Sequence, residues 1–330
     1  MRTVFQRAAA VTALFVASGF AAGQATPDRL YYGINRPIPF TVSAPEGAGA
    51  VQLVLYDGAG KQIVTRASVE PGEVDLFEVF PILWNRTLPQ PFYLQTVIDD
   101  AQVGPPVFLE PLRPPRQSTI NPRTTKIEWA PDKRRPYSGL RAYPAKFVEF
   151  TTSQGAFTVK LRPDEAPHTA KHILDLVEGG FYTDIVVHRI LPTNANGDPF
   201  VIQFGDPRGF GLGGPGHFVD LEPSNLRHDF GIVSMARQSD NPDSNGSQVF
   251  VCLSRTATAH LDDNYTSFAE VIDGADTLIA LESVELEDAS RGVPAEPKPV
   301  VLSARAYDAP PIGEWPSRVS RPSPSTEQPR

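Results

Sequence analysis

Three polar side chains interrupt apolar, strand-like runs in the second half of the chain. Arg189 lies in VHRIL, Gln203 in FVIQF and Gln248 in SQVFVCL. Alternate residues of a strand share a face, so each run presents one face of mixed polar and apolar character. Taken singly, the arginine would be a surface salt-bridge arm and each glutamine a solvated edge residue. Together, beside Phe200 and Phe250, they predict a groove for an uncharged peptide.

The chemistry open to such a groove is electrostatic. Arginine stays protonated at ordinary pH, so it donates hydrogen bonds but does not transfer protons. No GxSxG motif occurs, and none of the six histidines lies in a recognisable nucleophile signature. A serine hydrolase therefore has no positive support, although a catalytic triad could still assemble in space.

Two further patterns resemble ligand sites but lack the required context. The glycines of GFGLGG (209–214) follow a turn and precede Pro215, where a dinucleotide-binding fold needs a helix, so we expect a surface loop. His168 and His172 are spaced for metal but lack the Glu of HExxH, and we expect them on a helix surface. Cys252 is the only cysteine, which leaves no internal disulfide, and we expect a buried, inert thiol. We predict no metal and no cofactor.

The elements that must position Arg189 and the glutamines are many short strands and two helices. KFVEFTTSQGAFTVKL reads as two strands around a turn, and Ala170, Ile173, Leu174 and Val177 give a helix starting at Pro167 its apolar face. Further strands are predicted at 185–191, 200–204, 230–235, 248–253, 267–272 and 298–306, and a short helix at 275–284. The protein is thus predicted to be mainly β, with a closed eight-stranded barrel capped by two helices over residues 145–309.

Residues 26–125 carry short apolar runs broken by turn residues and no chemical constellation. AVQLVLYDGAGKQIVTRASV predicts a hairpin with its turn at Asp57, Gly58 and Gly60. The spacing of the runs favours a small immunoglobulin-like β-sandwich with an accessory role. Residues 126–144, rich in Pro, Arg and Lys, are predicted to be a linker, and residues 310–330 a disordered tail.

The N-terminus has the layout of a secretory signal peptide over residues 1–25. Arg2 and Arg7 precede an apolar stretch from Ala8 to Phe20, and cleavage after Gly23 or Ala25 would fit. The stretch is too short to span a bilayer, which needs about 20 residues. The net charge of −8 argues against binding to nucleic acid or anionic lipid. We therefore expect an exported, periplasmic or extracellular protein, without a membrane span, acting as a monomer.

Several motifs in series resemble the cyclophilin family of peptidyl-prolyl cis-trans isomerases. In order and spacing, HRILP (188–192), FVIQFGDP (200–207), GLGGPG (211–216), HDFGIVSMA (228–236), NGSQVFV (245–251) and HLDDNYTSFAEVIDG (260–274) are similar to the cyclophilin core. The resemblance covers residues 145 to 306, about half of the chain. It implies an isomerase that acts on X-Pro bonds.

The resemblance also implies roles for individual residues. Arg189 matches the catalytic arginine, and Gln203 and Gln248 match the two glutamines that hold the substrate backbone. The matching substrate-binding positions are Phe200, Val201, Ala236, Arg237, Phe250, His260, Leu261 and Tyr265.

Four positions and one insertion depart from the usual cyclophilin pattern. Val201 stands where Met is common, Arg237 replaces a typical Asn, and Tyr265 replaces a frequent His. His260 occupies the position of a tryptophan that is important for cyclosporin binding, so tight binding of that drug is not expected. Six extra residues separate Pro192 from Phe200.

We therefore predict an isomerase that accelerates X-Pro rotation in unfolded or exported proteins. Its arginine would donate a hydrogen bond to the twisted imide, and its apolar pocket would hold the proline. The alternative is a proline-peptide binding or chaperone scaffold module with weak or no catalysis.

Overall fold

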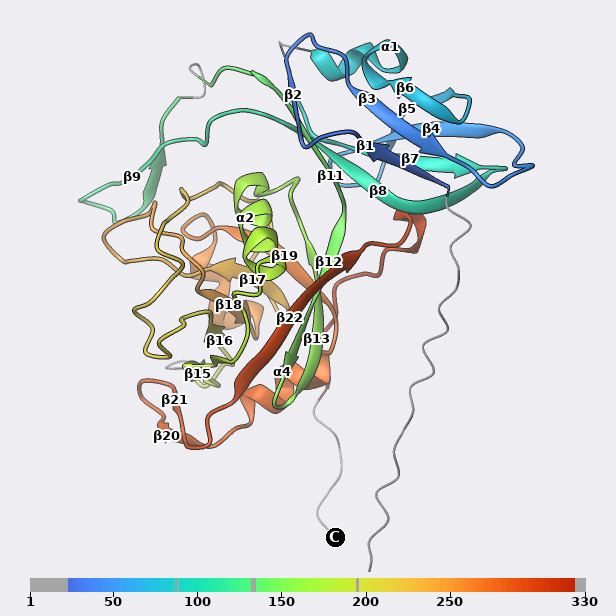
Figure 1. Ribbon diagram of the computed structural model, residues 1–330. Helices are drawn as coiled ribbons and strands as arrows, with labels where there is room; N and C mark the ends of the chain where they lie inside the picture. Colours follow the sequence, from blue (N-terminus) through green and yellow to red (C-terminus); the bar gives the residue numbers. More distant parts are fainter. Residues whose placement is uncertain (1–22, 86, 88, 132–134, 194–195, 324–330) are drawn as a thin grey trace, which may run out of the picture.

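A computed structural model describes residues 23–323 apart from 86, 88, 132–134 and 194–195. The chain forms two β-rich bodies, a sandwich built from its first half and a curved sheet with helices built from its second (Figure 1). Almost all of the predicted signal peptide lies outside the described residues. In the part of the chain that is described, we find no helix with the length and apolar content that crossing a membrane requires.

Two antiparallel sheets form the N-terminal body. One has the order β1 (Gln24–Pro27), β3 (Pro39–Ser43), β6 (Gly72–Asp75). The other has the order β2 (Tyr31–Gly33), β11 (Gly139–Pro144), β8 (Ala101–Pro111), β7 (Phe92–Ile98), β4 (Val51–Asp57), β5 (Ile63–Ser68). The short helix α1 (Leu76–Val79) and a 3-10 turn (Pro81–Trp84) follow β6. Side chains from both sheets, among them Phe40, Leu53 and Leu94, share one buried core. This body is therefore a two-sheet sandwich.

The β4–β5 hairpin confirms the turn predicted at residues 57–60. The backbone N–H of Asp57 donates to Gln62 O over 2.8 Å, and that of Gly60 to Asp57 O over 2.9 Å. Asp57 Oδ1 also accepts the N–H of Lys61 at 2.7 Å. Gly60 has φ +69°, a conformation that side chains with a Cβ seldom adopt.

The predicted linker is wrong for residues 139–144, which form β11 inside the larger sheet. β11 pairs with β2 on one side and with β8 on the other. Its Leu140 and Ala142 are buried in the sandwich core. Upstream, β9 (Ser118–Ile120) and β10 (Ile127–Trp129) form a small hairpin. The prolines and basic residues around β11 favour a linker by composition, while the strands that pair with β11 lie elsewhere in the chain.

The C-terminal body is a nine-stranded antiparallel sheet. Its order is β14 (Ile185–Val186), β22 (Val300–Asp308), β12 (Lys146–Thr152), β13 (Gly155–Leu161), β19 (Ser267–Asp273), β17 (Ile232–Met235), β18 (Val249–Cys252), β16 (Val201–Phe204), β15 (Arg189–Leu191). A separate hairpin, β20 (Leu286–Asp288) and β21 (Val293–Pro294), precedes β22.

The prediction of a closed eight-stranded barrel is wrong in strand number and in closure. The single strand expected at 185–191 is split into the two edges of the sheet, β14 and β15, which do not pair with each other among the described strands. The backbone explains the split. Val187 donates its N–H to Pro299 O and Ile190 to Gly292 O, so these groups bond to flanking segments. The sheet is strongly curved and open, with its two edges consecutive in the chain.

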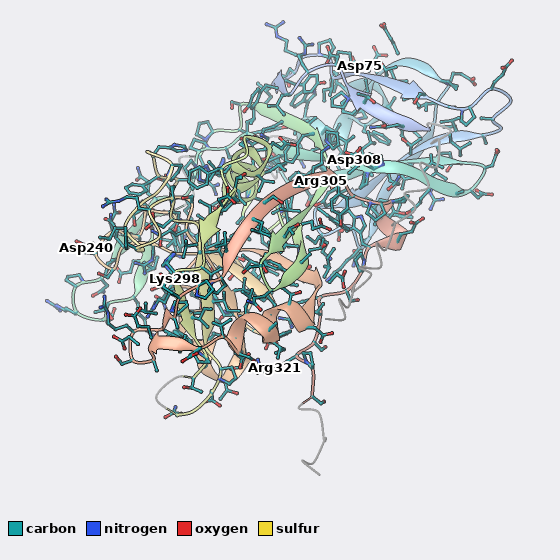
Figure 2. All side chains as sticks on the ribbon, turned by 60° about the horizontal axis from the view of Figure 1, so that its bottom comes forward. Asp75, Asp240, Lys298, Arg305, Asp308 and Arg321 are labelled. Atoms are coloured by element: carbon teal, nitrogen blue, oxygen red, sulfur yellow. The ribbon has the colours of Figure 1, made fainter. Side chains whose placement is uncertain are left out.

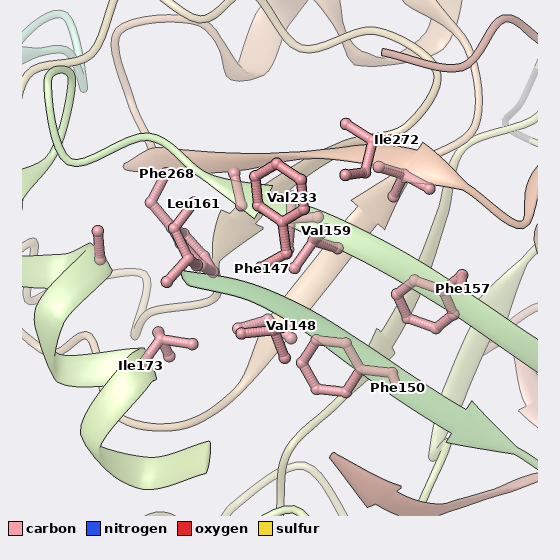
Figure 3. Close-up of a cluster of buried hydrophobic side chains, with 14 of the residues drawn as sticks. Phe147, Val148, Phe150, Phe157, Val159, Leu161, Ile173, Val233, Phe268 and Ile272 are labelled. Carbon is pink, nitrogen blue, oxygen red and sulfur yellow. The ribbon is translucent and has the colours of Figure 1, made fainter. Parts of the chain in front are cut away.

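Two longer helices pack on this sheet. α2 (Pro167–Glu178) lies against β22 and β19, and α4 (Ala275–Glu282) against β13 and β15. The predicted apolar face of α2 is confirmed, since Ala170, Ile173, Leu174 and Val177 are all buried. Figure 3 shows Ile173 of α2 facing Val148 and Phe150 of β12, within the main core. Two short helical turns, α3 (Arg255–Thr258) and Ala259–Leu261, follow β18.

The two bodies share one continuous core. Tyr93 and Phe108 of the sandwich pack with residues of the curved sheet. The segment after β22 joins them further, because Trp315 lies 5.0 Å from Tyr93 and 6.2 Å from Phe147, ring centroid to ring centroid. The tail predicted as disordered from residue 310 is therefore packed as far as residue 321, where Arg321 pairs with Glu282 over 2.8 Å, beside α4 (Figure 2). Residues 324–330 lie outside the described part.

Candidate functional site

Arg189 of β15, Gln203 of β16 and Gln248, which directly precedes β18, form one hydrogen-bonded row. Arg189 stands opposite Gln203 in the β15–β16 pair, and its Nη1 donates to Gln203 Oε1 over 3.4 Å. Gln203 Nε2 donates to Gln248 Oε1 over 3.0 Å, and Gln248 Nε2 donates to Gly213 O over 2.9 Å. The pairing register therefore brings together the three residues that the sequence marked as catalytic. We call them the polar row.

The guanidinium at the end of the polar row is open to a ligand. Arg189 is exposed, and no carboxylate of the described residues lies within ion-pair distance of it. An arginine has five N–H donors, of which the contact with Gln203 uses one. This guanidinium is therefore available to donate to a bound molecule.

A small apolar cluster, separate from the main core, lies beside the polar row. Val201, Phe250 and Leu261 are buried in it together with Ile232 and Cys252. The partly buried side chains packed against it are Leu191, Phe200, Ala236 and Tyr265. We call this set the apolar cluster. It contains six of the eight residues that the resemblance marked as substrate-binding.

The other two predicted residues border the apolar cluster. The ring of His260 stacks on Phe200 with 5.7 Å between centroids. The Arg237 guanidinium lies over Tyr265, 4.7 Å from the ring centroid, and Tyr265 meets Phe250 edge to face at 5.6 Å. Arg237 also donates to Asn264 O over 3.0 Å and to Gln238 O over 2.8 Å. Its side chain is thus engaged within the protein.

A cleft of about 710 Å³ opens on the other side of the polar row. Four predicted site residues line it: Gln203, Gln248, Ala236 and Arg237. One wall is the glycine-rich segment 211–218, and a second wall is formed by Gln238, Ser239, Asp240 and Ser244 of the loop 238–244. Arg189 and the aromatic residues of the apolar cluster do not line this cleft. The site therefore consists of an apolar cluster and a cleft, with the polar row between them.

The insertion before Phe200 leaves the register of the site intact. Phe200 donates its N–H to Leu191 O over 3.1 Å, and Leu191 stands opposite Val201. The additional residues therefore leave the Leu191–Val201 pair in place. Asn194 and Ala195 lie outside the described residues.

Asp206 is a buried residue that our sequence analysis did not assign to the site. Its carboxylate accepts the backbone N–H groups of Arg208, Phe210 and Leu212 at 2.7, 3.0 and 2.9 Å. Burial acts to raise the pKa of Asp206, but these N–H groups outweigh it and lower the pKa. A Cβ on Gly213 would collide with the same carboxylate, so this position requires glycine. The glycine-rich segment is thus a fixed wall of the cleft.

His228, also missed, forms a triad-like arrangement under the apolar cluster. Its Nδ1 lies 3.0 Å from Asp262 Oδ1, and its Nε2 lies 3.1 Å from Ser234 Oγ and 3.2 Å from Ser267 Oγ. Its ring stacks on Phe250 at 5.9 Å. His228 and both serines are at most 1% exposed, so no substrate can reach them. The arrangement supports Phe250 and gives no support to a hydrolase.

Burial and charge set the pKa values of this buried pair. Burial lowers the pKa of His228, against the effect of Asp262, which raises it. Burial acts to raise the pKa of Asp262, yet hydrogen bonds from Arg255 and His228 lower it to about 2. The pair thus holds a neutral imidazole and a carboxylate.

His168, His172 and Cys252 all lie in contact with the protein interior or its backbone. His168 and His172 are not free on the helix surface, since the Nε2 of each meets a backbone oxygen, Arg113 O at 3.1 Å and Gly246 O at 2.7 Å. Cys252 is buried as predicted, and burial raises the pKa of its thiol. Among the described residues, no group of three or more His, Cys, Asp and Glu could hold a metal ion.

Comparison with known proteins finds relatives of the second half of the chain. The family model described as cyclophilin type peptidyl-prolyl cis-trans isomerase matches residues 147–305. Peptidyl-prolyl cis-trans isomerase-like 1 of Emericella nidulans is 40% identical, over 38% of this chain and 75% of that protein. Peptidyl-prolyl cis-trans isomerase 10 of Caenorhabditis elegans is 38% identical, over 44% of this chain and 86% of that protein.

Two other matches are to a longer protein and to a solved structure. Peptidyl-prolyl cis-trans isomerase-like 2 of Rhizopus delemar is 35% identical over 44% of this chain, and the match spans 26% of that protein. A crystal structure of a Cryptosporidium parvum cyclophilin type isomerase in the presence of the dipeptide Ala-Pro is 30% identical over 49% of this chain and 99% of that chain, with a TM-score of 0.44.

Proposed function

The chain belongs to the cyclophilin-type peptidyl-prolyl cis-trans isomerase family, and from that membership we propose that it accelerates rotation about X-Pro bonds in exported proteins. The observation that carries the proposal is the polar row beside the apolar cluster. An exposed guanidinium and two amide side chains stand next to apolar and aromatic side chains of the character that a prolyl ring needs.

Rotation about an amide must break its resonance, at a barrier of roughly 18 to 20 kcal/mol. No covalent bond forms or breaks, so the protein has only to favour the twisted state. In that state the prolyl nitrogen regains its lone pair, and the Arg189 guanidinium can donate to it. This hydrogen bond does not exist in either planar isomer, so it stabilises the transition state selectively.

The remaining residues would hold the substrate in place. Phe200, Val201, Phe250 and Leu261 would seat the prolyl ring, and Gln203 and Gln248 would bind backbone groups on either side. The cleft beyond the polar row would accommodate residues that precede the proline. Because each contact is to a ring or to the backbone, the site fits proline-containing segments of many unfolded chains. The chemistry needs neither metal nor cofactor.

The alternative is a module that binds proline-containing segments with weak or no catalysis. The observation that favours it is the accessory sandwich, which shares a core with the isomerase body and adds surface without adding chemistry. Binding and turnover separate the two functions. A binding module would take up peptide without changing its exchange rate.

Export is proposed on the composition of residues 1–25. The structure favours cleavage after Gly23 over cleavage after Ala25, because Gln24 and Ala25 are paired with Ser43 and Val42 in the β1–β3 ladder. Cleavage after Ala25 would remove half of β1. Sequencing the N-terminus of the exported protein would show which bond is cut, and a start at Gln24 is expected. An intact Met1 in the exported protein would contradict the proposal.

The proposed activity is tested with a proline-containing tetrapeptide and the full chain from Gln24. Exchange spectroscopy should show cis and trans resonances exchanging faster at catalytic protein concentrations than without protein. Titration of the same peptide gives its affinity independently. Acceleration supports the isomerase, saturable binding without acceleration supports the binding module, and neither effect would refute both.

A further inference from the structure

One wall of the cleft is connected to the accessory sandwich. The wall is the loop 238–244, whose Gln238, Ser239, Asp240 and Ser244 line the cleft. The loop is closed internally, since Ser244 Oγ accepts the N–H of Gln238 at 2.8 Å and donates to Asn241 O over 2.6 Å. Such bonds fix the shape of the loop but not its distance from the glycine-rich wall.

Asp243 anchors this loop from outside. Its Oδ1 accepts the backbone N–H of Leu221 and the hydroxyl of Ser118, each at 2.9 Å. A second carboxylate is close, because Asp243 raises the pKa of Asp220 further after burial has raised it. Two neighbouring carboxylates repel each other unless donors compensate them. The Ser118 hydroxyl is one of only two such donors to Asp243 among the described residues.

Ser118 belongs to the accessory part of the chain and is held rigidly there. It lies in β9, opposite Trp129 of β10, and is 8% exposed. The segment leaves the sandwich where Leu112 donates to Gly139 O over 2.7 Å, and returns where Ser138 donates to Leu112 O over 3.1 Å. Figure 1 shows it running from the sandwich down the side of the other body to β9. Figure 2 shows Asp240, on the loop, at the end of the molecule away from Asp75 of the sandwich.

Contacts of Arg116 hold the β9–β10 hairpin in place. Arg116 Nε donates to Ala130 O over 2.9 Å, and its guanidinium lies over the Trp129 ring at 5.6 Å. Ala130 in turn donates its N–H to Gln117 O over 3.0 Å. Ser118 therefore presents its hydroxyl to Asp243 from a braced strand.

We propose that Ser118 is a positioning residue, through which the accessory sandwich holds the 238–244 wall at the distance that binds a peptide. The proposal rests on the proposed function of the cleft. Ser118 touches neither the polar row nor the apolar cluster, so its loss changes how tightly the peptide is held and not how the imide is twisted.

The test compares Ser118→Ala with Thr119→Ala in the full chain. Thr119 is the exposed neighbour whose hydroxyl contacts only Glu128 O of the same hairpin, at 3.5 Å. With the proline tetrapeptide, Ser118→Ala should raise KM, and the Kd measured by titration, by about 3- to 10-fold. Its kcat should stay within about twofold, and Thr119→Ala should match the parent protein in all three.

A second measurement reports directly on the loop 238–244. Hydrogen exchange of the Asp243 and Leu221 amides should be faster in Ser118→Ala, and Ser118→Ala should add nothing in an Asp243→Ala background. Unchanged KM, Kd and amide exchange in Ser118→Ala would overturn the inference. If the parent protein neither binds nor turns over peptide, the proposed function fails, while amide exchange still decides whether Ser118 holds the wall.

Discussion

Two polar networks lie beside Phe250, and they differ in whether their hydrogen-bonding groups all have partners among the described residues. The polar row of Arg189, Gln203 and Gln248 is partly exposed and keeps free donors at its arginine. The His228–Asp262 network beneath is buried, and each of its polar atoms has a partner inside the protein. By residue type the buried network looks more like an active site. Exposure and unused hydrogen-bonding capacity are the reasons for which we propose the polar row as the functional one.

The largest effect is expected from a substitution that breaks the buried network. His228→Ala removes a stacked ring from Phe250 and leaves Ser234 and Ser267 without their ring partner. The free energy of unfolding should fall by about 3 kcal/mol, as for buried polar groups that lose a partner while a cavity forms. Urea unfolding measures it, with the exposed His217→Ala as control. A loss as small as that of the control would show that the network is not structural.

A fall in pH should lower the stability of the protein without changing its turnover. Burial lowers the pKa values of His168, His172 and His228 from 6.5. Below pH 6.5 the unfolded chain therefore binds more protons than the folded one, and stability is lost as the pH falls. We expect a loss of roughly 2 kcal/mol between pH 7.5 and 5.5. Turnover by the folded protein should stay level over this range because Arg189 remains protonated.

Thermal unfolding and peptide exchange at matched pH values test both halves of this prediction. Stability that is constant or rises toward pH 5.5 would contradict the account of the histidines. A turnover that follows a single titration near pH 6.5 would contradict the account of the polar row.

The smallest effect concerns the middle of the polar row. Gln203→Ala removes the acceptor that orients Arg189 and the donor to Gln248, but leaves the guanidinium in place. We expect kcat/KM to fall about tenfold with stability unchanged. Gln102→Ala in the sandwich is a matched amide control remote from the site. A Gln203→Ala protein with full activity would mean that the guanidinium needs no orientation.

How well the sequence predicted each region depended on whether the partners were local. Strand alternation and the serial motifs placed Arg189, Gln203, Gln248 and Phe250 correctly, because neighbouring strands of one sheet bring these motifs together. The helix face of α2 follows from its own periodicity. The residues that support the site could not be predicted from local sequence, because Asp262 lies 34 residues from His228 and Asp243 lies 125 residues from Ser118.

The errors in the fold have the same origin. β11 does not follow from local sequence because its partners β2 and β8 are distant in the chain. The order of the tail does not follow either, because Trp315 finds its apolar surroundings only where the two bodies meet. The sheet does not close at Val187 and Ile190, where the backbone N–H groups bond to segments that no periodicity indicates. Local patterns predict elements, and only the assembled chain shows their partners.

The central claim is that the Arg189 guanidinium, whose partner among the described residues is Gln203, lowers the barrier to imide rotation. The direct measurement is the cis–trans exchange rate of a proline tetrapeptide with the parent protein, with Arg189→Ala, and with Arg36→Ala as an exposed arginine outside the site. We predict that Arg189→Ala loses at least about 100-fold in kcat/KM while its unfolding curve and that of Arg36→Ala remain unchanged. Full exchange activity in a folded Arg189→Ala protein would contradict the account.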